Sequence, residues 1–156
     1  MKIYVATDHA GFSHKEALKK YFEDKSFEIV DCGAKEYKDG DQYPVYMSEA
    51  ARNVQADAFH APSFAIIFGG SGQGEAIVAN RFPHVRAIVY AGGNLELVKL
   101  GKEHNDANIL SIGARFCTEE EMIIAVETFL TTPFSHAERH VERIIEIEEM
   151  TKHDIL

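Results

Sequence analysis

The order of the expected strands and helices is the feature that most constrains this fold. Five β-rich runs are expected to form strands, at residues 2–7, 27–31, 64–68, 85–90 and 108–112. Between and after them, segments with helical spacing of apolar residues are expected at 13–25, 44–56, 74–81, 94–104, 118–130 and 135–150. This alternation requires right-handed crossovers and a parallel sheet covered on both faces. We therefore predict an α/β fold: a three-layer α/β/α Rossmann-like domain with a five-stranded parallel sheet and an extended C-terminal helix.

No linker, repeat or low-complexity tract interrupts this pattern. The 156 residues fit one domain with a proper core. We expect a single domain over residues 1–156, with about the last six residues frayed.

The bulk composition excludes some classes of partner. The formal net charge of −9 argues against nucleic acid as the main ligand. Two cysteines suggest neither a metal site nor a disulfide framework, and they are expected to be small apolar fillers. No signal peptide and no membrane-spanning run is evident, so we expect a cytoplasmic protein.

A glycine loop followed by an acid stands out in the middle of the chain. The run Phe64–Phe68 is expected to be a buried strand, and four glycines follow it within residues 69–74. Free N–H groups where a helix begins attract anions and developing oxyanions. Glu75 would repel a phosphate there, but it would suit proton abstraction beside an oxyanion site.

The loop does not match the common nucleotide motifs. No Lys-Ser/Thr pair follows its last glycine, and the spacing and the missing ribose-binding acid make it a poor dinucleotide fingerprint. A flexible turn between strand and helix remains an alternative.

Three other groups carry possible chemistry. Asp8 and His9 follow the first strand, where parallel sheets bind ligands, although a helix cap would also explain them. His104 ends a helix, where a histidine is often only a cap. Arg139 and Arg143 share one helical face and suit a phosphate, unless they pair with nearby glutamates.

Taken together, the motifs resemble those of the type B ribose-5-phosphate isomerase family, which includes galactose- and allose-phosphate isomerases. The resemblance covers residues 2–150. The matching motifs, in chain order, are Asp8-His9-Ala10-Gly11, Asp31-Cys32-Gly33, Tyr43-Pro44, Gly70-Ser71-Gly72-Gln73-Gly74-Glu75, Ala79-Asn80-Arg81, His104-Asn105-Asp106, Ile112-Gly113-Ala114-Arg115 and Arg139-His140-x-x-Arg143.

This resemblance implies roles for individual residues. Sugar contacts would fall on Asp8, His9 and Tyr43, and the anion loop on Gly70, Ser71, Gly72, Gln73 and Gly74. His104 would be the ring-opening acid, with Asn105 as a ligand contact. The phosphate grips would be Arg115, Arg139 and Arg143.

The resemblance also implies an assembly. Family members form dimers, often paired into tetramers, with sites shared between subunits. His104, Asn105 and Arg115 would then complete the partner's site.

This chain departs from the family pattern at three places. Many members carry a catalytic Cys where this chain has Gly69, and a second branch carries a Glu that Glu75 matches. The usual Asp before Tyr-Pro is Gln42 here, and the segment at 91–101 is about two residues longer.

The implied activity is aldose–ketose isomerisation without metal or organic cofactor. Ribose 5-phosphate and ribulose 5-phosphate would interconvert through an enediolate, with Glu75 as base and Ser71 supporting the oxyanion. A six-carbon sugar phosphate, such as allose or galactose 6-phosphate, is the alternative substrate. A non-catalytic sugar-phosphate binder is the alternative from another class.

Overall fold

A five-stranded parallel sheet forms the centre of the protein. The computed structural model describes residues 1–151, and the rest of the segment expected to fray lies outside them. The sheet has the order β2-β1-β3-β5-β4, and its neighbouring strands are parallel. Its strands are β1 (Lys2–Thr7), β2 (Glu28–Asp31), β3 (Phe64–Gly69), β4 (Ala87–Tyr90) and β5 (Ile109–Gly113).

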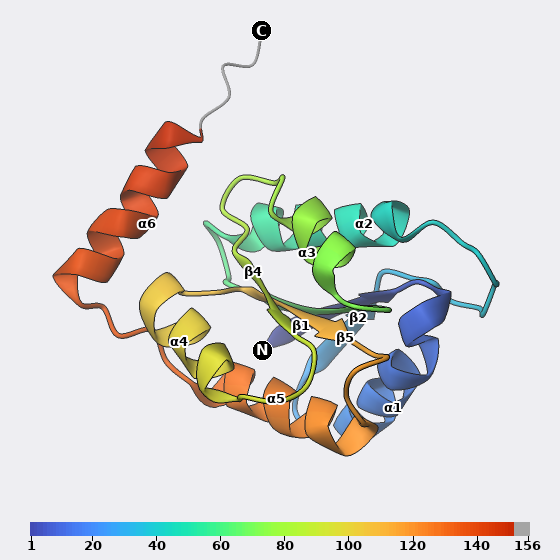
Figure 1. Ribbon diagram of the computed structural model, residues 1–156. Helices are drawn as coiled ribbons and strands as arrows, with labels where there is room; N and C mark the ends of the chain where they lie inside the picture. Colours follow the sequence, from blue (N-terminus) through green and yellow to red (C-terminus); the bar gives the residue numbers. More distant parts are fainter. Residues whose placement is uncertain (152–156) are drawn as a thin grey trace, which may run out of the picture.

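Helices cover both faces of this sheet (Figure 1). They are α1 (Phe12–Phe22), α2 (Tyr43–Asp57), α3 (Gln73–Ala79), α4 (Glu96–Asn105), α5 (Glu119–Thr131) and α6 (Glu138–Met150), with a short 3-10 helix η1 (His9–Gly11) before α1. One core cluster lies between the sheet and α1, α4 and α5, and the other lies under α2 and α3. The predicted three-layer α/β/α fold is confirmed.

Side-chain alternation along the central strands supplies both cores. In β3, Ile66 and Phe68 face the first cluster, whereas Ala65 and Ile67 face the second. Both sets are fully buried. A strand between two helical layers is apolar on both faces, which explains the unbroken apolar run in the sequence.

Some element boundaries differ from the prediction. The last helix begins at Glu138 rather than 135, because the preceding residues form a turn: Ser135 Oγ accepts from the N–H of Ala137 at 3.3 Å, and His136 has a φ of 53°. Strand β4 begins at Ala87 rather than 85, since the Arg86 N–H donates to the Asn108 side chain at 2.8 Å instead of joining the sheet.

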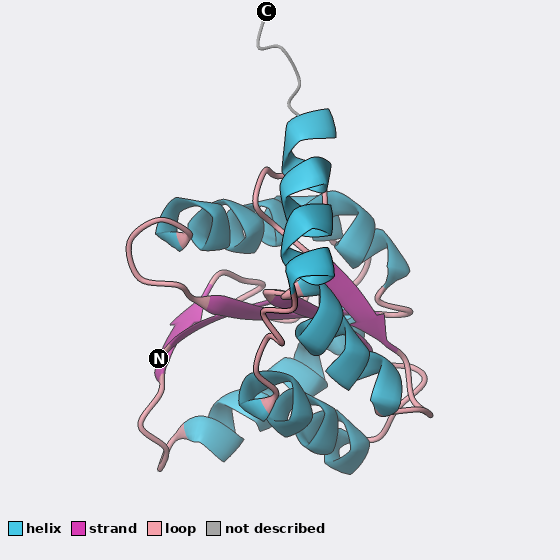
Figure 2. Ribbon diagram, turned by 90° about the vertical axis from the view of Figure 1, so that its left-hand side faces the viewer, coloured by secondary structure: helices cyan, strands magenta, loops and turns pink. Residues whose placement is uncertain are grey.

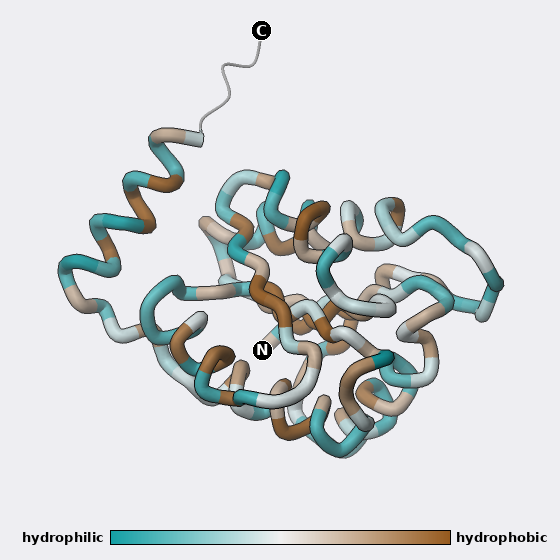
Figure 3. Tube along the Cα trace, viewed as in Figure 1, coloured by the Kyte–Doolittle hydropathy of each residue, from teal (hydrophilic) through white to brown (hydrophobic). Residues whose placement is uncertain are grey.

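Helix α6 extends away from the body of the fold (Figure 2). His140 is the one residue of α6 that is buried. Near its other end, Glu148 pairs with His84 Nδ1 at 3.0 Å. Hydrophobic residues are interspersed with hydrophilic ones along the helix (Figure 3), and Ile145, Ile147 and Met150 are exposed. The predicted extended C-terminal helix is therefore confirmed.

Within residues 1–151, none of the helices combines the length and the hydrophobicity that a membrane span requires.

The start of α5 offers a direct test of local stability. The Thr118 side chain accepts from the Glu121 N–H, and the Glu121 carboxylate accepts from the Thr118 N–H, forming a capping box. The change Thr118→Ala should lower the free energy of unfolding by about 1 kcal/mol, measured by urea unfolding at fixed protein concentration. Thr118→Ser keeps the hydroxyl and should stay near wild type. Equal loss in both variants would contradict the capping role.

Candidate active site

Three neighbouring strands bring candidate residues to one edge of the sheet. Thr7 pairs with Phe68, and Gly69 pairs with Gly113, so β1, β3 and β5 end side by side. The Asp8-His9 pair, the glycine loop and Arg115 directly follow these three strands. Ligands of parallel α/β sheets bind at this carboxyl edge.

Hydrogen bonds from β5 and the segment after it hold the glycine loop. The Ser111 hydroxyl donates to the Gly72 carbonyl at 2.7 Å. The N–H groups of Ala114 and Arg115 donate to the carbonyls of Gly69 and Gly70 at 2.9 and 3.1 Å. The loop is therefore anchored to the sheet, which argues against the alternative of a flexible turn.

Backbone geometry explains one glycine of the loop. Gly72 has a φ of +76°, in the left-handed region, and it is the N-cap of α3. A side chain there would be strained whatever the space around it. The loop can thus turn directly from β3 into α3.

The side chain of Glu75 folds back over the end of β3. A Cβ atom added to Gly69 would lie 1.8 Å from Glu75 Oε1 and 2.1 Å from its carboxyl carbon. The carboxylate therefore occupies the space that a side chain at 69 would take. Any cysteine at this position would displace it.

Glu75 is buried, with 4% of its surface exposed. Burial raises the pKa of its carboxyl group, and the nearby Asp8 charge adds to the rise, although a backbone hydrogen bond opposes it. The effect of burial is larger than that of this hydrogen bond, so the pKa is raised overall. A carboxylate with a raised pKa is better suited to proton abstraction near neutral pH.

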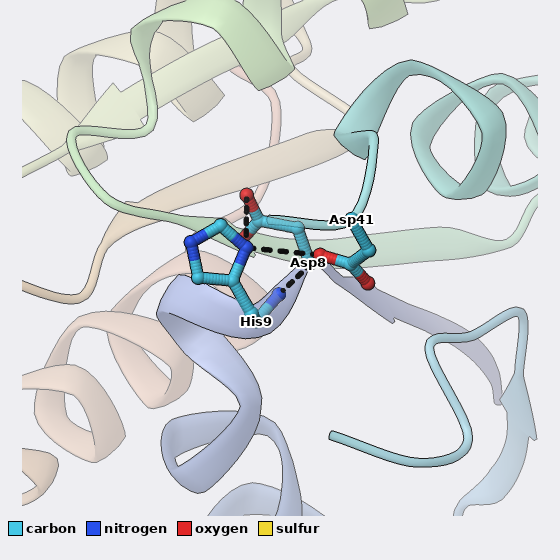
Figure 4. A group of neighbouring side chains, drawn as sticks. All are labelled: Asp8, His9 and Asp41. Atoms are coloured by element: carbon cyan, nitrogen blue, oxygen red, sulfur yellow. Dashed lines mark hydrogen bonds and ion pairs between the residues drawn. The ribbon is translucent and has the colours of Figure 1, made fainter. Parts of the chain in front are cut away.

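Asp8, His9 and Asp41 form a cluster (Figure 4), and the Asp8 charge is near enough to act on Glu75. Asp41 Oδ1 accepts from the His9 backbone N–H at 2.8 Å and lies 2.9 Å from its ring Nδ1. Asp8 Oδ1 caps η1 by accepting from the Ala10 N–H at 2.9 Å. His9 donates through Nδ1 to Asp41, which leaves Nε2 free to meet a ligand.

The same cluster has the spacing of a metal site. One ligand-type atom from each of Asp8, His9 and Asp41 lies within 4.8 Å of the others. The contact between His9 and Asp41 uses two of these atoms in a hydrogen bond. The His9 backbone N–H and ring together lower the pKa of the Asp41 carboxyl, against the effect of burial.

Further predicted contacts lie around the loop. The Tyr43 hydroxyl would be 2.7 Å from a Cβ at Gly74, so the two residues touch. Ser71 and Gln73 are exposed, and the Ser71 hydroxyl accepts from the Gln73 N–H at 3.3 Å. The Arg115 guanidinium lies beside Gly70 of its own chain, 3.3 Å from the position of a Cβ there.

The remaining predicted residues lie at the opposite edge of the sheet. His104 and Asn105 end α4, and the Asn105 carbonyl accepts from Arg86, just before β4, at 2.9 Å. Strand β5 spans five residues, so roughly 15 Å of sheet separates the two edges. The chain therefore divides the predicted site into two groups.

Helix α6 adds its arginines to this second group. The centroids of the His104 and His140 rings lie 4.2 Å apart, and the Arg139 side chain donates a hydrogen bond to the His140 ring. Among residues 1–151, neither Arg139 nor Arg143 forms an ion pair within 4.0 Å. Within this part of the chain, the structure therefore contradicts the alternative that these two arginines form surface ion pairs with nearby glutamates.

Neither cysteine is available at the loop. Cys32 and Cys117 are both buried. Burial raises the pKa of each thiol to about 11, so neither is a thiolate near neutral pH. Their prediction as fillers agrees with this environment.

The structure defines an α/β protein in which a buried acid, Glu75, lies beside a glycine loop suited to binding anions. Comparisons with known proteins identify the family to which such a protein belongs. A family model described as Ribose/Galactose Isomerase matches residues 3–147. The chain belongs to this ribose/galactose isomerase family.

Individual relatives agree with this assignment. Ribose-5-phosphate isomerase B of Mycolicibacterium paratuberculosis is 39% identical over 92% of this chain and 87% of its own length. That of Mycobacterium tuberculosis is 38% identical over 92% and 86%. A crystal structure of ribose-5-phosphate isomerase B from Mycoplasma genitalium with bound ribulose-5-phosphate has a TM-score of 0.90 and 29% identity, covering 97% of both chains.

Sequence reasoning missed two residues of this arrangement. Asp41 contacts His9, although the family position for an acid was expected at Gln42, which is exposed. His140 stood in a recognised motif without a role. The acid next to Gln42 and the Arg-His-x-x-Arg spacing were the available signals. The contacts themselves join His9 to Asp41, 32 residues apart, and His104 to His140, 36 residues apart.

Proposed function

We propose that this protein interconverts ribose 5-phosphate and ribulose 5-phosphate through an enediolate, with Glu75 as the base. The observation that carries the proposal is the buried Glu75 carboxylate, with its raised pKa, beside a glycine loop anchored to the sheet. The names of the relatives, and the ribulose-5-phosphate bound in one of them, support the substrate.

The reaction begins with opening of the furanose ring, in which His104 acts as acid. Glu75 then removes a proton from the carbon beside the carbonyl and returns it to the neighbouring carbon. Between these two steps the hydroxyl proton on the second carbon passes to the oxygen of the first, so that the carbonyl shifts by one position and the protons balance. One carboxylate suffices for both transfers, because the two carbons are adjacent.

The glycine loop stabilises the charge that develops during this transfer. Its N–H groups and the Ser71 hydroxyl would hold the enediolate oxygen, and each such donor typically contributes about 3–4 kcal/mol. Asp8, His9 and Tyr43 bind the sugar, with Gln73 and Asn105 as further contacts. Arg115, Arg139 and Arg143 bind the phosphate.

The candidate residues lie at two opposite edges of the sheet. This placement supports a site shared between subunits of a homodimer, or of a tetramer of paired dimers. Glu75 lies at the carboxyl edge of the sheet, whereas His104 and Asn105 lie at the other edge. One chain cannot bring them to one sugar, so a second copy supplies the missing group. Arg115 lies beside Gly70 of its own chain. The same proposal includes that its side chain contributes to the partner's site.

The proposed reaction needs no cofactor, since a carboxylate and an imidazole supply the proton transfers. We propose that residues 1–156 act as one isomerase domain in the cytoplasm. Metal chelation should leave the rate unchanged.

Two other functions are weighed against this one. Isomerisation of a six-carbon sugar phosphate uses the same chemistry, and pocket depth separates the two. A non-catalytic sugar-phosphate binder needs the arginines but no buried carboxylate beside the loop, so Glu75 favours an enzyme.

The substrate assay tests the proposal directly. We expect purified protein to convert ribose 5-phosphate into ribulose 5-phosphate faster than it isomerises allose or galactose 6-phosphate. A higher kcat/KM on a six-carbon sugar would change the substrate assignment. If the protein bound these sugar phosphates but converted none of them, it would be a non-catalytic sugar-phosphate binder.

Replacing the base separates chemistry from stability. Glu75→Gln should lower kcat by at least about a hundredfold, because the amide cannot accept the proton. The folded pKa of Glu75 is raised, so its stabilising contribution exists at low pH and is lost as pH rises through that pKa. At neutral pH the variant should therefore unfold at the same or a higher urea concentration. Near-wild-type turnover would remove Glu75 as the base.

Complementation tests the shared site. Glu75→Gln and His104→Asn should each be inactive alone. Co-expressed as mixed dimers, they should regain about a quarter of wild-type activity, because half the dimers are mixed and each has one intact site. No recovery in isolated mixed dimers would place both groups in one chain's site.

A further inference from the structure

The ring of His140 joins two parts of the second residue group. It is 4% exposed, although it lies on a helix whose other side chains are not buried. Its Nδ1 lies 2.8 Å from the Ser135 hydroxyl, and its Nε2 accepts from the Arg139 Nε–H at 3.1 Å. One face of the ring packs on His104, with 4.2 Å between centroids and 38° between planes.

These contacts define the protonation form of the ring. Arg139 can only donate, so Nε2 must carry a lone pair. The ring proton of neutral His140 is then on Nδ1, which donates to the Ser135 hydroxyl. The imidazolium form has an N–H at both nitrogens and would lose the bond from Arg139.

The surroundings favour this neutral form. Burial lowers the pKa of His140, and electrostatic interactions with His104, Arg139 and Arg143 lower it further, against one backbone hydrogen bond to the Glu103 carbonyl. The groups that face the ring come from α4, α6 and the turn before α6. No carboxylate among them is an ion-pair partner of His140 within residues 1–151.

The bond to Nε2 orients the Arg139 guanidinium. It uses the Nε–H and leaves both terminal nitrogens to bind an anion in a forked geometry. Holding the exposed side chain in one direction lowers the entropy that binding would otherwise cost. The same ring limits the orientations open to His104 by stacking on it.

We propose that His140 is a positioning residue that aims Arg139 at the substrate phosphate and His104 at the sugar ring through two separate contacts of one neutral imidazole. This inference rests on the proposed isomerase function. It assigns His140 no contact with substrate.

Two substitutions separate the two contacts. His140→Phe keeps an aromatic ring against His104 but removes the acceptor for Arg139, so KM for ribose 5-phosphate should rise about tenfold with a smaller change in kcat. His140→Gln can present a carbonyl oxygen near the former Nε2 but removes the ring, so kcat should fall roughly threefold or more with KM nearly kept.

A matched control uses a histidine outside this group. His60 is exposed, and His60→Phe and His60→Gln should leave both constants at wild-type values. Equal changes of kcat and KM in the two His140 variants would overturn the proposal, as would wild-type constants in His140→Phe.

The protonation form gives a readout that does not depend on activity. In protein with 15N-labelled histidine, NMR should show the His140 ring protonated at Nδ1 and not at Nε2 at neutral pH. Ser135→Ala removes the acceptor and should shift the ring toward the Nε2–H form. An Nε2–H form or an imidazolium in the wild type would overturn the proposal even if the enzyme is active. An inactive wild type with the Nδ1–H form would instead reject the isomerase function.

Discussion

The contact between the Glu75 carboxylate and the Cα of Gly69 is the constraint on which the site depends. The carboxylate fills the space where a side chain at 69 would begin. Glycine at the end of β3 is thus what allows Glu75 to lie over the carboxyl edge of the sheet. A cysteine at position 69 and this placement of the Glu75 carboxylate exclude each other sterically.

Burial of that carboxylate links function to stability. The environment that raises the pKa of Glu75 also disfavours its charged form in the folded protein. The Asp8 charge nearby adds to this effect. The anchored loop supports the arrangement, since its hydrogen bonds to β5 and the residues after it hold the backbone beneath the carboxylate.

Strand direction decides where the other residues lie. A helix that follows a parallel strand returns to the amino edge, so α4 ends with His104 and Asn105 far from the glycine loop. Helix α6 meets them there through His140. The distribution of residues over two edges makes assembly part of the proposed chemistry. Within one of the two groups, His140 contacts both His104, the proposed acid, and Arg139, a proposed phosphate-binding residue.

The sequence by itself determined the layer order, the carboxyl-edge loops and most candidate residues, because strand and helix periodicities and turn residues are local properties. It could not tell whether His104 caps its helix or contacts a ligand. Nor could it tell whether Arg139 forms ion pairs with nearby glutamates. Those outcomes depend on contacts between segments distant in the chain. Only the tertiary structure decided that Asp41 contacts His9, that His140 is buried against His104, and that burial raises the pKa of Glu75. Burial and long-range packing act on the folded chain as a whole, and no local pattern specifies them.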